Sequence, residues 1–247
     1  MLISFVTVNK NSGVLLDQTS KSIISFLRTN KNHSWLIIDS NSNDQSDICI
    51  KNLLKLKDDL PINIIRENDD GIYQAMNKAI KNINSKYLLF INSGDTLNES
   101  DLLNTLKATK KFENHSIICG YIIRNRSKII LNELKRIINN LEIAFKLRLP
   151  TSHNSIVYLT ESLKKFYFNE KFKCSADYNQ YLEMLEDNQN FIDKRKYKIV
   201  NISNDGFISK RRSESYQDCI TINTEKGRII GIIYWKIKFL ILNLIFL

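Results

Sequence analysis

The chain has 247 residues, of which 43% are hydrophobic, enough for one large domain with a well-filled core. Two prolines and seven glycines exclude a fibrous protein and argue against a disordered one. The four cysteines lie far apart without a Cys-x-x-Cys pair, so neither a zinc site nor a disulfide framework is indicated. This cysteine usage favours a reducing, cytosolic compartment.

Positive charge is unevenly distributed along the chain. The formal net charge is +10, and from Asn190 onward eleven lysines and arginines stand against five acidic residues. Such a bias suits an anionic surface, either a membrane or a nucleic acid. The basic residues are not interleaved with a recognisable aromatic nucleic-acid motif, so we expect no nucleic-acid partner and favour a membrane surface.

The first 95 residues alternate between two apolar patterns. Short continuous apolar runs ended by turn-forming residues predict buried strands, and apolar residues at helical spacing predict amphipathic helices. The expected strands are 2–8, 35–38, 61–66 and 87–91, and the expected helices are 14–27, 48–56 and 71–83. The first of these runs is typical of a strand rather than of a signal peptide. The alternation predicts a parallel, doubly wound α/β sheet with right-handed crossovers.

Polar and acidic side chains stand where these predicted strands end. They are Thr7, Asn9, Asp39, the pair Asp69 and Asp70, and Asp95. Open α/β sheets bind ligands beyond the carboxyl ends of their strands. A row of carboxylates is costly there unless it meets cations or hydrogen-bond donors, so we expect a site for a metal and a polar ligand.

The remaining residues predict further helices and strands and a distinct C-terminal segment. The expected helices are 102–112, 133–149 and 176–186, the last with Ser175 as N-cap, and the expected strands are 116–123, 155–159 and 197–202. From Ile229 to Leu247 the chain is very apolar, interrupted by Lys236 and Lys238. Two lysines argue against a simple membrane span. An in-plane membrane anchor and a helix packed on the domain or in a dimer interface both remain open.

Several stretches, taken in order, resemble one family. They are Ile3-Ser-Phe-Val-Thr-Val-Asn9, Leu36-Ile-Ile-Asp39, Glu67-Asn-Asp-Asp-Gly-Ile-Tyr-Gln-Ala-Met-Asn-Lys78, Leu89-Phe-Ile-Asn-Ser-Gly-Asp95, Pro150-Thr-Ser-His153 and Phe172-Lys-Cys-Ser-Ala-Asp-Tyr178. The chain resembles the glycosyltransferase family two enzymes over about residues 2–205, in particular bacterial members of the colanic-acid type that build surface polysaccharides. The resemblance implies the GT-A fold, a Rossmann-like, mostly parallel sheet flanked by helices, here with a C-terminal helical extension.

The resemblance also implies a nucleotide-sugar donor and places residues around it. The implied donor-binding residues are Thr7, Asn9, Asp39, Asp69, Gly71, Tyr73, Asn77, Lys78, Asn92 and Ser93. Asp39 would accept a hydrogen bond from the nucleotide base, although an Asx turn is the alternative for this residue. The choice between Asp69 and Asp70 stays open, and Tyr73 and Lys78 could equally be ordinary helix residues.

The metal, the base and one histidine follow from the same resemblance. Asp95 would bind Mn²⁺ or Mg²⁺, together with substrate phosphates and water, although Gly94 stands where many members have an acid. Asp177 would be the general base, and the alternative is an acid favoured by the helix dipole. His153 would contact phosphate, metal or acceptor.

The expected activity is that of an inverting, hexosyltransferase-like enzyme. It would move a sugar, with UDP-sugar as the expected donor, onto a growing glycan or lipid-linked glycan at the cytoplasmic face of the membrane. Residues 1–212 would form the catalytic domain, with a nucleotide-binding half 1–95 and an acceptor half 96–212, and 213–247 a helical, membrane-associating tail. An oligomer is compatible with the sequence. The alternatives are a non-catalytic basic binding protein and a degenerate transferase.

Overall fold

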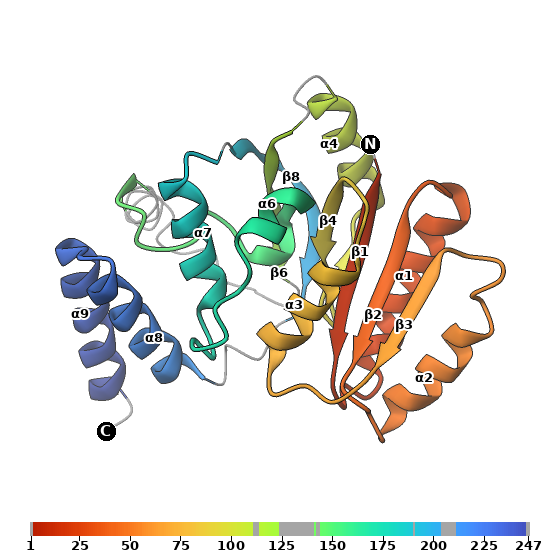
Figure 1. Ribbon diagram of the computed structural model, residues 1–247, viewed down its shortest axis with the longest axis horizontal. Helices are drawn as coiled ribbons and strands as arrows, with labels where there is room; N and C mark the ends of the chain where they lie inside the picture. Colours follow the sequence, from red (N-terminus) through yellow and green to blue (C-terminus); the bar gives the residue numbers. More distant parts are fainter. Residues whose placement is uncertain are drawn as a thin grey trace.

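An eight-stranded sheet runs through the part of the chain that the computed structural model describes, namely residues 2–110, 114–123, 141, 144–189, 191–203 and 211–245 (Figure 1). Its strand order is β3-β2-β1-β4-β7-β6-β8-β5. The elements are β1 (Ile3–Asn9), α1 (Leu15–Thr29), β2 (Ser34–Asp39), α2 (Gln45–Leu54), β3 (Ile62–Arg66), α3 (Ile72–Asn82), β4 (Tyr87–Phe90), β5 (Thr96–Leu97), α4 (Glu99–Thr109), β6 (Ser116–Ile123), η1 (His153–Ser155), β7 (Ile156–Leu159), α6 (Thr160–Lys165), α7 (Ala176–Glu186), β8 (Phe191–Ile202), α8 (Arg212–Glu225) and α9 (Ile229–Ile245).

The first four strands of the sheet, β3, β2, β1 and β4, are all parallel. Side chains alternate between the two faces, as the pleat requires. Phe5 and Trp35 lie in one buried cluster with residues of α1, α2 and α4, whereas Val6 and Leu36 lie in the other cluster with residues of α3, α6 and α7. Helices therefore cover both faces, which confirms the predicted α/β class and explains why these strands read as continuous apolar runs.

The second part of the sheet is mixed in direction. β7 is antiparallel to both β4 and β6, while β6 and β8 run parallel to each other. The expected strand 197–202 is the end of a longer one, because β8 begins at Phe191. The residues from Asp193 to Lys196 are all charged, and no apolar run marks them as a strand. The sheet is thus mostly parallel, but it is not parallel throughout.

Other expected elements differ from the structure at their ends. The expected helix 133–149 lies mostly outside the described residues, and the described part from Phe145 to Leu149 is turn and loop. β3 begins at Ile62 rather than at Pro61, and α2 begins at Gln45, three residues before the expected start. Asp44 caps α2 by accepting a hydrogen bond from the backbone N–H of Ser46, which fixes that earlier start.

The two C-terminal helices pack against each other and against α7 (Figure 1). Gly231 of α9 lies directly on Asn223 of α8, because a Cβ at position 231 would be 1.9 Å from the Asn223 side-chain oxygen. Trp235 is buried, with its ring 5.2 Å from that of Tyr216 and 6.3 Å from that of Tyr178. Among the residues described, no helix combines the length and apolarity that crossing a bilayer requires.

The cap of α7 comes from another helix. Ser175 occupies the expected N-cap position, but its side chain makes no capping bond and instead contacts Ser215 of α8 at 2.8 Å. Asp218 of α8 takes over the capping role, since its Oδ2 accepts hydrogen bonds from the backbone N–H of Cys174 at 2.7 Å and of Ser175 at 3.2 Å. Burial raises the pKa of Asp218 in spite of these two bonds. The expected N-cap position of Ser175 is therefore confirmed, although its side chain does not make the capping bond.

Replacing Asp218 separates the capping bonds from the charge. We expect Asp218→Ala to lower the free energy of unfolding by about 1–2 kcal/mol, because two buried N–H groups lose their acceptor. Asp218→Asn keeps an acceptor oxygen and removes a charge that burial disfavours, so its stability should match that of the wild type. Urea denaturation measures both variants, with Asp187→Ala as a surface control. Equal stability of the Ala variant and the wild type would contradict the capping role.

Candidate active site

A cavity of about 1110 Å³ lies beyond the carboxyl ends of β1 and β4. Its walls come from the end of β1, the turn after β4, the start of α3, the segment around η1 and the first turn of α7. Of the residues expected at the site, those that line it are Asn9, Asp69, Gly71, Tyr73, Asn92, Ser93, Asp95, His153 and Asp177. The fold thus brings together residues that are up to 168 positions apart in the sequence, counted from Asn9 to Asp177.

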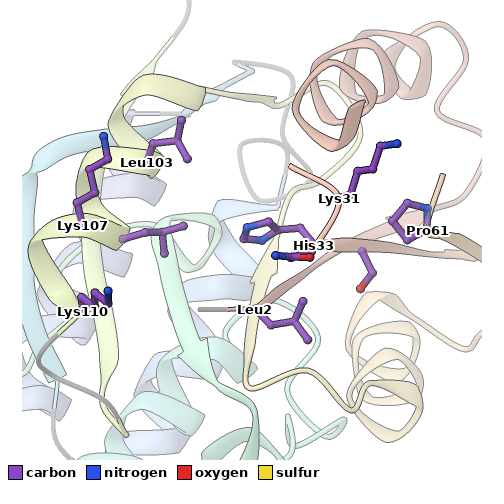
Figure 2. Close-up of a pocket in the computed structure, with 10 residues that line it drawn as sticks. Leu2, Lys31, His33, Pro61, Leu103, Lys107 and Lys110 are labelled. Carbon is purple, nitrogen blue, oxygen red and sulfur yellow. The ribbon is translucent and has the colours of Figure 1, made fainter. Parts of the chain in front are cut away.

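A second cavity, of about 850 Å³, lies at the start of β1 and is a poor candidate for the same chemistry (Figure 2). Lys107 of α4 and Lys110, directly after α4, stand on one side of it and Lys31 on the other, around Leu2 and His33. None of the described residues that line it carries a carboxylate, and none belongs to the expected site. The acidic residues therefore single out the first cavity.

Asp177 is held on the cavity wall by two aromatic side chains. Its Oδ1 accepts hydrogen bonds from the Tyr73 hydroxyl at 3.2 Å and from the backbone N–H of Tyr178 at 2.9 Å. Nδ1 of His153 lies 3.4 Å from Oδ2 of Asp177. Burial, followed by the charge of Asp177, raises the pKa of Tyr73 well above its usual value, so Tyr73 stays a hydrogen-bond donor. This arrangement orients a carboxylate that can accept a proton.

Asp95 is buried, and its hydrogen bonds do not fully offset the cost of burying its charge. Its Oδ1 accepts a hydrogen bond from the backbone N–H of Ser203 at 2.9 Å, and its Oδ2 accepts a close one from the Asn154 amide. Burial nevertheless raises the pKa of Asp95 above its ordinary value. Oδ1 of Asn92 and Nε2 of His153 are among the buried cavity atoms that have no hydrogen-bond partner among the described residues. Such orphaned acceptors beside a disfavoured carboxylate are a place where a cation fits.

The protein can supply only part of a metal's coordination shell here. No group of three or more His, Cys, Asp or Glu within the described residues could hold a metal ion. Gly94, which stands where the family resemblance implies an acid, has a φ of +97°, and a Cβ there would lie 3.3 Å from the Cβ of Ser203 and 3.4 Å from Leu15. A side chain at this position would be strained and crowded. The turn thus leaves Asp95 as the carboxylate of this stretch that faces the cavity.

Asp69 and Lys78 form a pair at the edge of the cavity. Oδ1 of Asp69 lies 2.6 Å from Nζ of Lys78, which also lies 3.1 Å from Glu67. Lys78 is therefore engaged with the loop before α3 and does not line the cavity. Gly71 begins α3 with a φ of +155°, and a Cβ there would meet nothing within 4 Å. The helix N-terminus is therefore open toward the cavity, and the N-terminus of a helix attracts anionic groups.

Asp39 lies behind the cavity wall and does not line it. Its side chain is fully buried, where Oδ1 accepts hydrogen bonds from Asn9 at 2.7 Å and from Ser42 at 2.6 Å. Nε of Arg66 lies 3.1 Å from its Oδ2. The described contacts of Asp39 thus position Asn9, and contact with a nucleotide base stays a prediction.

Thr7 and Asn77 make structural contacts rather than cavity contacts. Thr7 donates to the carbonyl oxygen of Ile91 at 2.8 Å and accepts from the Trp35 indole at 3.0 Å. The amide of Asn77 pairs with the backbone of Phe168, donating at 2.8 Å and accepting at 2.9 Å. The same amide donates to Glu170 at 2.9 Å. Asn77 thus holds a residue that itself lines the cavity.

Several cavity residues have no signal in the sequence that would reveal them. They are Lys10, Ser12, Ser40, Asn154, Glu170, Lys173 and Ser203. Asn154 is the most connected of them, because its amide contacts both Asp95 and Asn92. Its position next to His153 in the sequence is the only hint at this role. Lys10, Lys173 and Arg211 add positive charge to a cavity that also holds several carboxylates. Asp70, which the sequence offers as the alternative to Asp69, lines the cavity together with it.

A family model and one curated protein match this chain in sequence. The model described as Glycosyl transferase family 2 matches residues 4–175. Poly(ribitol-phosphate) beta-N-acetylglucosaminyltransferase TarP of Staphylococcus aureus is 23% identical over 235 residues, which cover 90% of this chain and 70% of TarP.

Solved structures match the fold at low sequence identity. TarS 1–349 of S. aureus in complex with UDP-GlcNAc has a TM-score of 0.69 at 17% identity, over 91% of this chain and 66% of that fragment. Mannosyltransferase PcManGT of Pyrobaculum calidifontis, in complex with GDP-Man and Mn²⁺, has a TM-score of 0.68 at 14% identity, over 92% and 64% of the two chains. The chain spans about two thirds of the length of these structures, and the likeness confirms the expected GT-A fold. Since the family model spans more than half of it, the chain belongs to glycosyl transferase family 2 and is a glycosyltransferase.

Proposed function

We propose that this glycosyltransferase moves a sugar from a nucleotide-sugar donor to a bacterial surface glycan, with inversion at the anomeric carbon. The observation that carries the proposal is that two carboxylates line one cavity. Asp177 is oriented by the Tyr73 hydroxyl, and burial raises the pKa of Asp95. UDP-GlcNAc is the first donor to test, because TarS was solved with it and TarP is named for transfer of N-acetylglucosamine. A polyol-phosphate glycan is the corresponding first acceptor.

In the proposed reaction Asp177 is the general base. The acceptor hydroxyl transfers its proton to the Asp177 carboxylate as its oxygen forms a bond to the anomeric carbon, and the bond from that carbon to the diphosphate oxygen breaks. Attack from the side opposite the leaving group inverts the configuration. The hydroxyl of Tyr73 and the imidazole of His153 keep the carboxylate in one orientation throughout. The open N-terminus of α3 at Gly71 and the side chains of Lys173 and Arg211 face the departing diphosphate.

Asp95, Asn92 and His153 are the residues that would hold a divalent cation. A bound Mn²⁺ or Mg²⁺ would offset the negative charge of the diphosphate, and it accepts shared coordination by one carboxylate, phosphate oxygens and water. PcManGT, a structural neighbour, was solved with Mn²⁺. We further propose that Asn9 and Ser93, which line the cavity and are hydrogen-bonded to each other at 3.0 Å, contact the donor. We also propose that transfer takes place on the cytoplasmic side of the membrane.

Nucleotide binding is the direct test of the donor proposal. Isothermal titration of the full chain with UDP, GDP and UDP-GlcNAc, each with and without Mn²⁺, should give binding that depends on the metal. The three titrations also decide between uracil and guanine as the base. Failure of both nucleotides to bind in the presence of Mn²⁺ or Mg²⁺ would remove the donor site from this cavity.

Asp177→Asn should separate catalysis from binding. Loss of the base is expected to lower the rate of UDP release in the presence of acceptor by about 10²–10⁴-fold, with UDP affinity within about twofold of the wild type. Asp187→Asn, on the exposed end of α7, serves as the matched control and should keep full activity. An Asp177→Asn enzyme with wild-type turnover would show that another group accepts the proton. A wild-type chain that binds donor but transfers to no acceptor would instead favour the degenerate transferase.

Asp95→Asn should weaken metal binding without lowering the stability of the ligand-free protein. The pKa of Asp95 is raised in the folded state, so its contribution to stability is present at low pH and is lost as the pH rises through that raised pKa. At neutral pH, without metal, the neutral Asn variant should therefore melt no lower than the wild type. UDP with Mn²⁺ at a hundred times the dissociation constant should stabilise the wild type by about 2.7 kcal/mol. Thermal unfolding with and without both ligands measures this, and equal stabilisation of the variant would contradict the metal role.

A further inference from the structure

Helix α9 has two apolar faces, and only one of them is covered by the protein. The covered face carries Gly231, which lies on Asn223, and Trp235, which is buried between the rings of Tyr178 and Tyr216. Trp235 belongs to the same buried cluster as residues of the central sheet. One side of α9 is thus part of the protein core, and α9 is fixed in its orientation.

The opposite face of α9 is an exposed aliphatic stripe. Its members are each between 50% and 70% exposed: Ile229, Ile230, Ile233, Ile237, Leu240 and Ile241. The spacing of four, four and three residues from Ile229 to Leu240 places them on one side of a helix. A helix that only packs on its own domain carries polar residues on this side. A contiguous exposed aliphatic stripe marks an interaction surface.

Another exposed apolar residue has its backbone near the start of α9. Phe145 is 51% exposed, and the Arg228 guanidinium at the start of α9 donates a hydrogen bond to its carbonyl oxygen at 2.8 Å. Phe145 therefore lies beside the first turn of α9.

The charged residues of α9 and of the turn before it are all basic, and one of them, Lys226, is paired with Glu186 of α7 at 2.8 Å. From Lys226 to the last residue, the sequence contains Lys226, Arg228, Lys236 and Lys238 and no acidic residue. Lys236 is exposed beside the stripe, and Lys238 lies with its Nζ 4.6 Å from the centre of the Tyr234 ring. An aliphatic face flanked by lysines and aromatic rings is the composition of helices that lie in the plane of an anionic membrane surface.

We propose that the outer face of α9 docks in the plane of a lipid bilayer that exposes anionic headgroups. The covered face stays on the domain, so α9 lies along the surface rather than crossing it. A second copy of the chain is a poorer occupant, because pairing two such stripes would bring two sets of lysines together without an acidic partner in this segment. The proposal rests on α9 and does not depend on the donor site.

Vesicle co-sedimentation of the full chain tests the docking. The wild type should bind vesicles of phosphatidylcholine with phosphatidylglycerol and bind pure phosphatidylcholine weakly, and raising the salt from about 0.1 M to about 1 M should weaken the binding by screening. The variant Ile233→Ser/Ile237→Ser/Leu240→Ser should bind at least about tenfold more weakly. Lys236→Gln should lose about fivefold on the anionic vesicles alone.

Matched controls separate docking from loss of fold and from self-association. Ile48 and Leu54 are exposed on α2, at the opposite end of the molecule from α9 (Figure 1), so Ile48→Ser/Leu54→Ser should bind vesicles as the wild type does. UDP titration and light scattering accompany each variant. Equal binding of wild type and triple variant to anionic vesicles would overturn the proposal. A wild-type oligomer that the triple variant breaks, without any vesicle binding, would show that the face is an interface between copies.

Discussion

The site depends on the cost of burying carboxylates where the strands of a parallel sheet end. Asp39, Asp95 and Asp177 are all at least nine-tenths buried, and each needs partners to remain charged. Asp39 is compensated by Arg66 and two polar neighbours, and Asp177 is oriented by Tyr73, the Tyr178 backbone and His153. Asp95 has neutral donors only, and burial raises its pKa. The surroundings of Asp95 therefore differ from those of Asp39, which agrees with the cation-binding role proposed for Asp95.

Much of the parallel half of the fold is predictable from the sequence, because strands buried on both faces give unbroken apolar runs such as residues 87–90. The direction of β7 and the length of β8 are not predictable in this way, since pairing partners far apart in sequence decide them. The site is partly predictable from the sequence, because the carboxyl ends of parallel strands lie at the same edge of the sheet. The sequence does not predict which of the acids at this edge lines the cavity. Asp39, for example, pairs instead with Arg66, its register partner on β3.

Gly94 shows how one backbone turn sets the number of available ligands. Its positive φ and its close approach to Ser203 and Leu15 make a second carboxylate at this position strained and crowded. The backbone N–H of Ser203 and the amide of Asn154 take up the oxygens of Asp95 instead. In the absence of ligand, burying neutral donors beside Asp95 costs less free energy than burying a second carboxylate. With fewer protein carboxylates, more of the coordination of any bound cation falls to the substrate.

The cap that α8 places on α7 makes the C-terminal region part of the folding unit. Cys219, Ile222 and Trp235 belong to the same buried cluster as Val6 of the first strand. Cutting the chain before α8 would uncover that cluster and remove the acceptor for the N–H groups of Cys174 and Ser175, which stand three and two residues before Asp177. A shortened protein made for crystallisation or assay would thus lose order around Asp177, the proposed general base, even though every residue that lines the cavity from Val8 to Arg211 is still present.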